Sequence, residues 1–389
     1  MTINRTRRQH PAGPGRAATL LLSAVLVTTA AGPARAWQLA PEATATERGL
    51  AAMSGQLQQA INRGVFQGIA VVGKPVHEDI TRRALRCPID ASTDVPRWPG
   101  CEVDTRLLEA GVRWNDDPAF KFSKGQGNYP GCIPEHTVRL VTQPLCWVRV
   151  FKDGERTAAR GVRLTGRNSN LLARSHFGDL QFLHAMAVAE GEAAEQTQRN
   201  ILAWAEFTWR TSMGDPGFDA QRVVSQLPID GFAERFQHNR GWRIQDLFAL
   251  GNPGVRDAEA IRKIALGSLI HVVEDSFAAG HVDRAPPPSG ATCAGQPAPG
   301  LIREFHAYPK QDARRHGAAD APEALRAHES GARPNVVDVV RMLGILWGSG
   351  ASWEDAHPYL ACVFALAPDA RPSSPGEGYT STDRVQWGG

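Results

Sequence analysis

The sequence predicts a mostly α-helical protein whose long loops are held by disulfide bonds. In several stretches of the 389 residues, apolar side chains recur every three or four positions, the period of one face of an α-helix. The β-branched density typical of strands is confined to residues 137–141 and 146–151, which we expect to pair as a small hairpin. Six cysteines, four of them in the least periodic stretch, favour a single multi-helix domain with cross-linked loops.

Five segments carry the helical period clearly enough to be placed. The predicted helices cover residues 46–62, 77–86, 179–213, 258–280 and 336–346. The third is expected to break near Gly191. The fourth places Ile261, Ile264 and Leu269 at helical spacing, and Gly280 is a suitable C-terminal stop.

Residues 1–36 have the features of an export signal rather than of a folded segment. A basic region precedes the apolar, small-residue stretch 17–32, and Ala34-Arg35-Ala36 is a suitable cleavage site. The apolar stretch is too short to span a membrane, so we expect no transmembrane anchor. Cleavage would leave Trp37 at the N-terminus of a secreted or periplasmic protein, and residues 37–389 would form one catalytic domain.

The net charge gives no support for nucleic-acid binding once the leader is set aside. The whole chain has 43 Lys and Arg against 40 Asp and Glu, a formal charge of +3. Residues 1–36 contain five arginines and no acidic residue, so 38 basic residues face 40 acidic ones after cleavage. The basic balance of the precursor therefore belongs to its leader.

All six cysteines follow the predicted cleavage site. They are Cys87, Cys101, Cys132, Cys146, Cys293 and Cys362. An even number in an exported chain indicates up to three disulfides, whose pairing the sequence leaves open. No Cys-x-x-Cys pair suggests metal binding, so we expect a structural role for all six. We expect the Pro-rich stretch 285–300 to be a long surface loop.

The run His271-Val-Val-Glu-Asp-Ser-Phe-Ala-Ala-Gly-His281 is the strongest indication of chemistry. On the predicted helix, His271 and Asp275 lie one turn apart and can bind one cation. His281 follows the helix stop and can turn back toward the same site. Two imidazoles and a carboxylate are usual zinc ligands, so we expect a zinc site here.

Other candidate ligands are scattered along the chain, and each alone has a simpler explanation. His77 begins a predicted helix, and the polar and acidic residues there also suit the cap of a helix N-terminus. Asp116 lies shortly before a proline and is alone more often a turn residue. His176, ahead of a predicted helix, is more often a surface or core histidine. His316 and Asp320 repeat the four-residue spacing but also fit a solvated helix face.

Taken in order along the chain, these residues resemble the zinc-dependent phospholipase C and single-strand nuclease superfamily. The family's His-x3-Asp-x5-His motif matches His271, Asp275 and His281 with the same spacing. Members begin, after signal cleavage, with a metal-binding tryptophan, which Trp37 would match. The family's remaining histidines and carboxylates match His77, Asp116 after Trp-x, His176 in Ser-His-Phe, and the closing pair His316 and Asp320. The resemblance covers nearly all of residues 37–389.

The resemblance implies a helical fold with three zinc ions at the base of a cleft. The implied ligands are Asp116, His176, His271 and Asp275 for one ion, His281, His316 and Asp320 for a second, and Trp37, His77 and a shared Asp275 for the third. Asp116 would also serve as a general base. His306 is a rival for His316, but Lys310 rather than a carboxylate stands four positions after it.

The same resemblance leaves three functional interpretations open. The first is a secreted phospholipase C that hydrolyses phosphatidylcholine-type lipids at a membrane surface to diacylglycerol and a phosphorylated head group. Residues 276–277 and 282–284 are similar to bacterial members with this activity, and Ala279-Gly280 replaces the Gln-Pro pair usual in the nucleases. The second is a zinc nuclease for single-stranded nucleic acid. The third is a secreted binding protein stapled by zinc, although nine ligands over three ions leave open positions that favour catalysis.

Overall fold

The structure is a computed structural model, and it describes residues 74–88, 98–122, 132–239, 241–249, 257–331 and 334–382. All of the described residues belong to one compact unit. The predicted export signal, the predicted helix 46–62 and Trp37 lie outside the described residues.

About half of the structure is helical, so the prediction of a mostly α-helical protein is confirmed. The described residues contain twelve α-helices: α3 (Val76–Leu85), α4 (Arg106–Val112), α5 (Pro144–Ala159), α6 (Leu171–Phe177), α7 (Ala194–Met213), α8 (Phe232–Phe236), α9 (Ile244–Phe248), α10 (Ala258–Asp275), α11 (Ala313–Ala319), α12 (Pro322–Gly331), α13 (Val336–Gly348) and α14 (Trp353–Val363). Two 3-10 helices are η1 (Gln181–His184) and η2 (Val224–Gln226). Short antiparallel pairs join β1 (Phe120–Lys121) to β2 (Thr137–Val138), β3 (Val282–Ala285) to β6 (Leu301–Phe305), and β4 (Thr292–Cys293) to β5 (Gln296–Pro297).

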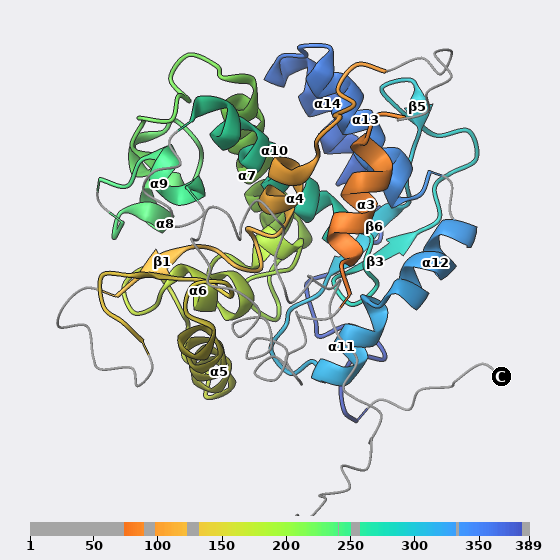
Figure 1. Ribbon diagram of the computed structural model, residues 1–389. Helices are drawn as coiled ribbons and strands as arrows, with labels where there is room; N and C mark the ends of the chain where they lie inside the picture. The colour runs from red at the N-terminus through yellow and green to blue at the C-terminus, as the bar shows by residue number, and fades with distance from the viewer. Residues whose placement is uncertain are drawn as a thin grey trace, which may run out of the picture. The chain divides into compact units, whose positions relative to one another are not determined.

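Helix α10 is the central element of this unit. Every residue from 264 to 275 is buried, and α4, α7, α13 and α3 pack around the helix (Figure 1). A helix that is buried on all sides needs an apolar surface on all sides, which the run Ile-Ala-Leu-Gly-Ser-Leu-Ile at 264–270 supplies. The polar C-terminal turn of α10 therefore lies inside the protein.

Two glycines allow α10 and α4 to approach closely. A Cβ atom on Gly267 would lie 2.4 Å from the carbonyl oxygen of Leu108 and 2.7 Å from Cα of Gly111. A Cβ atom on Gly111 would lie 2.3 Å from the carbonyl oxygen of Ile264. Real Cβ atoms do not come so near to a backbone, so this crossing requires glycine on both helices. It brings the turn after α4, which carries Asp116, against the middle of α10.

Three of the predicted helices are found nearly as expected, as α3, α10 and α13. The predicted segment 179–213 is divided, as expected near Gly191, into η1 and α7. Helix α10 ends at Asp275 rather than at residue 280, and a turn then leads to β3.

The predicted hairpin is wrong. Strand β2 pairs with β1 instead, and residues 146–151 belong to helix α5. The buried residues of α5 are Cys146, Trp147, Val150, Phe151 and Gly154, which recur with the helical period, and Pro144 stands at the helix start, where proline is favoured. The helical period thus prevails over the β-branched content of this run.

Three disulfides link Cys87 to Cys101, Cys132 to Cys146, and Cys293 to Cys362, so the predicted structural role of the six cysteines is confirmed. The last ties the Pro-rich loop to α14, and this loop contains the β4–β5 hairpin. Among the described residues, no helix is both long and apolar enough to cross a membrane.

Replacing Gly267 by alanine tests the helix crossing. We expect Gly267→Ala to lower the free energy of unfolding by about 1–3 kcal/mol or more, because the new methyl group meets the backbone of α4. Denaturant unfolding with the disulfides intact measures the change. Gly331→Ala is the matched control, since a Cβ there meets nothing within 4 Å, and it should change stability by less than about 0.5 kcal/mol. Equal stabilities of the two variants would contradict the crossing argument.

Candidate metal centre

The structure brings together all eight of the predicted ligands that it describes, and it adds His184. Their ligand atoms form four groups, three of which share residues, and within each group all atoms lie within 4.8 Å of one another. The groups are His77, Asp116 and His271; Asp116, His176 and His184; His184, His271 and Asp275; and His281, His316 and Asp320. All of these residues are buried except His176, which is partly exposed. Buried groups of this composition are able to hold metal ions, and zinc is compatible with them.

These side chains come from seven separate places in the chain. His77 lies in α3, Asp116 in the turn after α4, His176 in α6, His184 at the end of η1, His271 and Asp275 in the last turns of α10, His281 between α10 and β3, and His316 and Asp320 in and directly after α11. His176 was predicted to precede a helix, but it lies within α6. The nearby Asp179 pairs with Arg174 rather than capping a helix.

The contacts around His184 are compatible with a metal site. Its Nδ1 atom lies 3.0 Å from Nε2 of His271 and 3.0 Å from Oδ2 of Asp275. Those two atoms are themselves 2.8 Å apart, and Oδ1 of Asp116 is 3.7 Å from the same Nδ1. One imidazole nitrogen carries at most one hydrogen in one direction, so hydrogen bonds do not account for all of these contacts. A cation between the atoms satisfies every one of them.

His176 presents a lone pair to Asp116. Its Nδ1 lies 3.0 Å from the carbonyl oxygen of Leu172 and therefore carries the hydrogen. Its Nε2 is then an acceptor, 3.5 Å from Oδ1 of Asp116. Neither this Nε2 nor Oδ2 of Asp116 has a hydrogen-bond partner among the described residues. Two buried acceptors that face each other need a proton or a metal ion between them.

A second group is formed by His281, His316 and Asp320. Nδ1 of His281 donates to the carbonyl oxygen of His184 at 2.6 Å, and the other ring nitrogen, Nε2, lies 3.6 Å from Oδ2 of Asp320. Nε2 of His316 is also 3.6 Å from that oxygen, and the two imidazole rings stack with centroids 4.8 Å apart. Both carboxylate oxygens of Asp320 lack a hydrogen-bond partner within the described part of the chain.

His77 is oriented by a buried carboxylate from the neighbouring helix. Its Nδ1 lies 2.6 Å from Oε2 of Glu274, whose other oxygen accepts a hydrogen bond from Thr81 at 2.8 Å. The opposite ring nitrogen, Nε2, is 3.3 Å from Oδ1 of Asp275. Asp275 thus directs one oxygen to His77 and the other to His184 and His271. A histidine whose far nitrogen donates to a carboxylate is a usual arrangement for a metal ligand.

Burial and neighbouring charges set the protonation of the centre. Burial alone would raise the pKa of Asp275, but the positive charge of His281 and His271 holds that pKa well below its ordinary value. Burial lowers the pKa of His184 to about 4. Asp275 is therefore ionised and His184 neutral at pH 7, which is the state in which both donate to a metal ion.

The short segment between Asp275 and His281 is fixed by Arg284. The Arg284 guanidinium donates to the carbonyl oxygen and the hydroxyl of Ser276, at 2.7 and 2.9 Å, and lies 4.5 Å from the centroid of the Phe277 ring. These contacts close the turn that returns His281 toward the end of α10.

The turn that carries Asp116 is held by its buried neighbours. The side chain of Asn115 donates to the carbonyl oxygen of Leu183 at 2.7 Å, next to His184. Asp117 accepts hydrogen bonds from the guanidinium of Arg139 at 3.1 Å and from the backbone of Leu140 at 3.0 Å. These bonds connect the turn to η1 and to the start of the α5 region, so they fix the position of Asp116.

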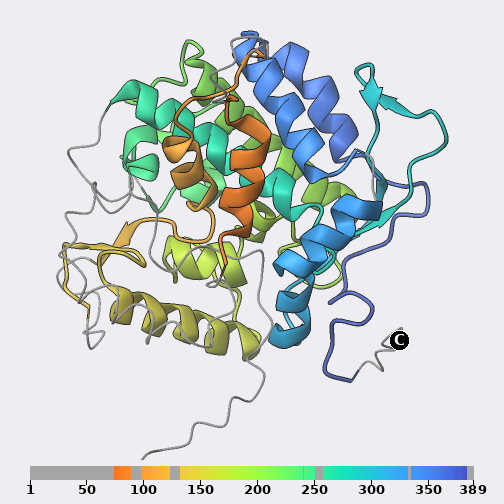
Figure 2. The same cartoon turned by 45° about the vertical axis from the view of Figure 1, so that its right-hand side comes forward.

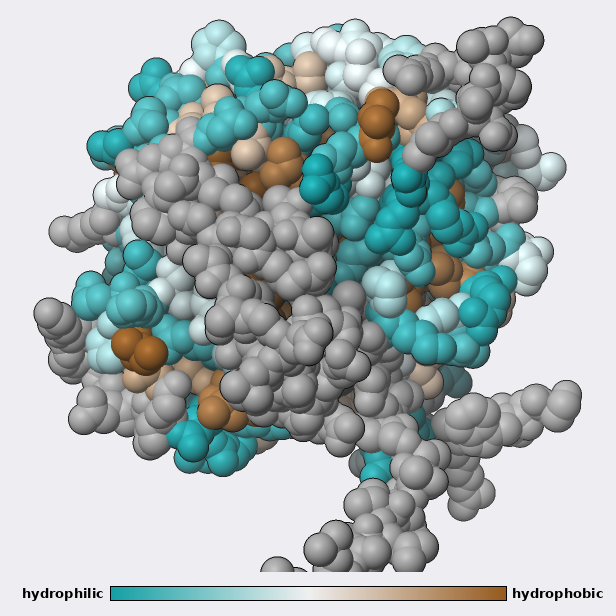
Figure 3. Space-filling model, in the orientation of Figure 1, coloured by the Kyte–Doolittle hydropathy of each residue, from teal (hydrophilic) through white to brown (hydrophobic). Residues whose placement is uncertain are grey.

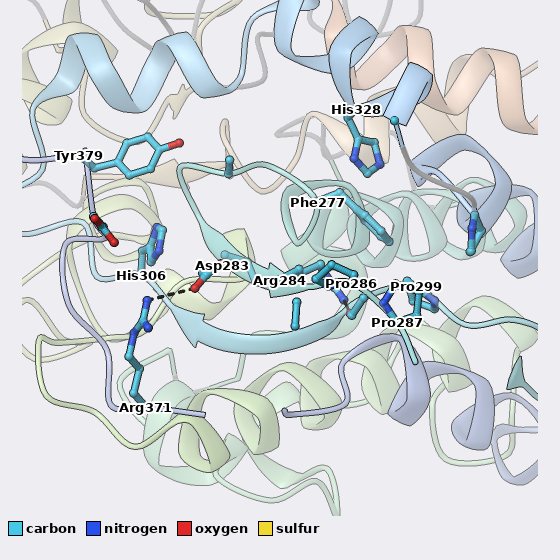
Figure 4. Close-up of a pocket in the computed structure, with 17 residues that line it drawn as sticks. Phe277, Asp283, Arg284, Pro286, Pro287, Pro299, His306, His328, Arg371 and Tyr379 are labelled. Atoms are coloured by element: carbon cyan, nitrogen blue, oxygen red, sulfur yellow. Dashed lines mark hydrogen bonds and ion pairs between the residues drawn. The ribbon is translucent and has the colours of Figure 1, made fainter. Parts of the chain in front are cut away.

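The rival histidine, His306, lies outside the four groups. Its Nδ1 is 3.1 Å from the carbonyl oxygen of Gly280, and its ring packs against Tyr379. His306 lines a neighbouring cavity of about 670 Å³ together with Asp283 (Figure 4). The geometry thus places His316, not His306, beside His281 and Asp320.

His184 was missed because its position depends on a backbone turn that the sequence does not reveal. The helical period predicted a continuous helix from residue 179 that would have placed His184 on a helix face. Instead the chain forms the short η1, which ends at Ala185 with a left-handed φ of 50°, and His184 lies buried beside His271 and Asp275. Its only sequence signal was a second histidine eight residues after His176.

Comparison with known proteins identifies no relative of this chain. No protein-family model matches it, and no curated protein or solved structure matches it significantly. The chemistry of the centre must therefore be inferred from its own residues.

Replacing His184 tests its place in the centre. We expect His184→Ala to weaken binding of one zinc ion at least about 100-fold, because three other donors depend on the same position. Metal analysis after dialysis, with circular dichroism as a check of folding, measures this. His306→Ala is the control, since His306 is also buried but lies outside the groups, and it should retain the zinc content of the unmodified protein. Unchanged zinc in the His184 variant would exclude His184 as a ligand.

Replacing Glu274 tests the orientation of His77. We expect Glu274→Gln to weaken zinc at His77 by about 10- to 100-fold, because the amide lacks the charge that strengthens the imidazole as a donor. Competition with a chromophoric chelator measures the affinity. Glu78→Gln removes another buried carboxylate, one that accepts from Arg113 at 2.6 Å, and should affect stability but not zinc affinity. Equal zinc affinities in both variants would contradict the proposed role of Glu274.

Proposed function

We propose that this protein is a secreted zinc metallophosphodiesterase, and specifically a phospholipase C for phosphatidylcholine-type lipids. The observation that carries the proposal is Asp275, a buried carboxylate whose two oxygens face different histidines. Such a carboxylate is suited to lie between two cations, and paired cations are suited to phosphodiester cleavage. The resemblance of residues 271–281 to the zinc phospholipase C and nuclease superfamily, with its three zinc ions, supports the same class.

The donor set favours catalysis over a purely structural metal. His281, His316 and Asp320 supply three ligands, whereas structural zinc sites are usually closed by four protein ligands. When bound, zinc would supply a water of lowered pKa and positive charge for the phosphate oxygens. Three disulfides fit the oxidising compartment that a secreted enzyme meets.

The chain's own residues have distinct tasks in this mechanism. Burial alone would raise the pKa of Asp116, but positive charge on His271 contributes most to lowering it to about 2. Asp116 is therefore ionised at pH 7, and its Oδ2, which has no hydrogen-bond partner among the described residues, can accept a hydrogen bond from the attacking water and orient it. Asp275 keeps a negative charge at the centre of the cluster. His77, held by Glu274, maintains the side of the cluster next to α3.

Phosphocholine release from phosphatidylcholine liposomes tests the proposal. Zinc-loaded protein should release water-soluble phosphocholine, and a chelator should abolish the release. Asp275→Asn should lose more than one zinc ion and lower the rate at least about 100-fold, because the carboxylate serves several donor groups. Full activity of this variant would exclude the cluster as the catalytic site. Chelator-sensitive cleavage of single-stranded DNA without phosphocholine release would instead favour the nuclease, and neither activity from metal-loaded protein would favour a zinc-stapled binding protein.

A further inference from the structure

Helix α5 carries a stripe of basic residues on its outer side. Among the exposed or half-exposed residues of α5 and its C-cap, one row recurs every three or four positions, at Leu145, Arg149, Lys152, Arg156 and Arg160, and the half-exposed acidic residues Asp153 and Glu155 lie beside it. The exposed fractions of the Lys152 and Arg156 side chains are 44% and 71%. These side chains form one row along the helix, about one residue for each turn. The row lies opposite the buried face that contains Val150 and Gly154.

The inner side of α5 packs beside the metal centre. The ring of Phe151 lies edge-on to the ring of His176, with centroids 5.0 Å apart. In both cartoon views α5 lies at the edge of the described part of the chain, with α6 between it and α10 (Figures 1 and 2). The basic stripe therefore faces outward from a helix that supports one of the candidate ligands.

Exposed aliphatic side chains gather at the two ends of this helix. Only four large hydrophobic residues are exposed in the described part of the chain, and three of them are Ile133, Leu145 and Val162, with exposed fractions of 57%, 51% and 44%. Ile133 is bonded through its backbone N–H to the Gln143 side chain, which places it beside the start of α5. Val162 follows the helix end. Figure 3 shows hydrophobic side chains next to hydrophilic ones in this part of the molecule.

The local charge is strongly positive. Residues 144–167 contain six arginines and lysines but only two acidic residues. Lys152 and Arg156 each pair with one of these acidic residues, at 3.0 and 3.7 Å, and such exposed pairs are weak. Arg149, Arg160 and Arg163 make no ion pair with any described residue. A chain that is nearly neutral after its predicted leader thus concentrates positive charge here.

We propose that this α5 surface (Ile133, Leu145, Arg149, Lys152, Arg156, Arg160, Val162 and Arg163) docks the protein on anionic lipid bilayers. Arginines and lysines attract anionic head groups, and the aliphatic side chains enter the interfacial layer. A nucleic-acid surface would instead offer aromatic rings for base stacking, and no aromatic residue is among the exposed hydrophobic side chains of the described chain. This docking proposal rests on the proposed phospholipase function, because docking would bring the metal centre to its lipid substrate.

Vesicle sedimentation with the zinc-loaded protein tests the docking surface. The vesicles contain phosphatidylcholine alone or with one quarter phosphatidylglycerol. We expect tight, salt-sensitive binding only to the anionic vesicles. Each arginine contributes about fivefold, so Arg149→Gln, Arg160→Gln and Arg163→Gln combined should weaken binding on the order of 100-fold. Leu145→Ser should weaken vesicle binding further. Because this variant loses apolar contact rather than charge, a higher salt concentration should not reproduce its effect.

A matched triple variant controls for net charge. Arg106→Gln, Arg222→Gln and Arg326→Gln remove the same charge from exposed sites elsewhere and should leave vesicle affinity within about threefold. Equal losses in the two triple variants would overturn the proposal. So would an absence of vesicle binding accompanied by binding of a single-stranded oligonucleotide that the α5 triple variant loses.

A soluble substrate separates this proposal from the proposed function. Both triple variants should hydrolyse monomeric short-chain phosphatidylcholine as fast as the unmodified protein, since none of the six arginines lies in the metal centre. Vesicle binding without any hydrolysis would sustain the docking surface and reject the phospholipase. Hydrolysis of the soluble lipid with no vesicle binding would reject only the docking surface.

Discussion

The burial of Asp275 is the constraint on which the rest of this structure depends. Its side chain is 2% exposed, and it ends a helix whose residues from 264 onward are all buried. An ionised carboxylate in such a place costs several kcal/mol unless charged or polar partners surround it. The partners are imidazoles from α3, η1, α10 itself and the turn before β3. These elements must therefore pack around α10 if the buried charge of Asp275 is to be balanced.

The close crossing of α10 and α4 places Asp116 next to the buried end of α10. Because Gly111 and Gly267 lack side chains, the backbone of α4 approaches α10 and leads directly into the turn with Asp116. A buried hydrogen bond donated by Asn115 to Leu183 and one accepted by Asp117 from Leu140 then fix that turn on both sides. A metal centre tolerates ligand displacements of only a few tenths of an ångström. Rigid packing next to the ligands supplies that accuracy, and a side chain at either glycine would disturb it.

The sequence was informative where short-range spacing decides the outcome. The four-residue interval of His271 and Asp275, the helical periods of α3, α10 and α13, and the even number of cysteines all carried over to the structure. The hairpin failed because β-branched content was weighed above the period of the buried residues in α5. His184 was missed because the expected longer helix is replaced by a short 3-10 helix that ends at the left-handed residue Ala185. Backbone turns of that kind depend on tertiary packing, which a single sequence does not encode locally. Trp37 lies outside the described residues, so its predicted role stays a prediction.

The donor groups on the two sides of Asp275 are unequal, and this inequality has chemical meaning. On one side, His184, His271 and Asp116 surround the carboxylate, and His176 adds a further imidazole. On the other side, His281, His316 and Asp320 supply three donors. A tetrahedral ion on the first side would have its positions filled by protein, which favours retention, whereas one on the second side would keep a position for an exchangeable ligand.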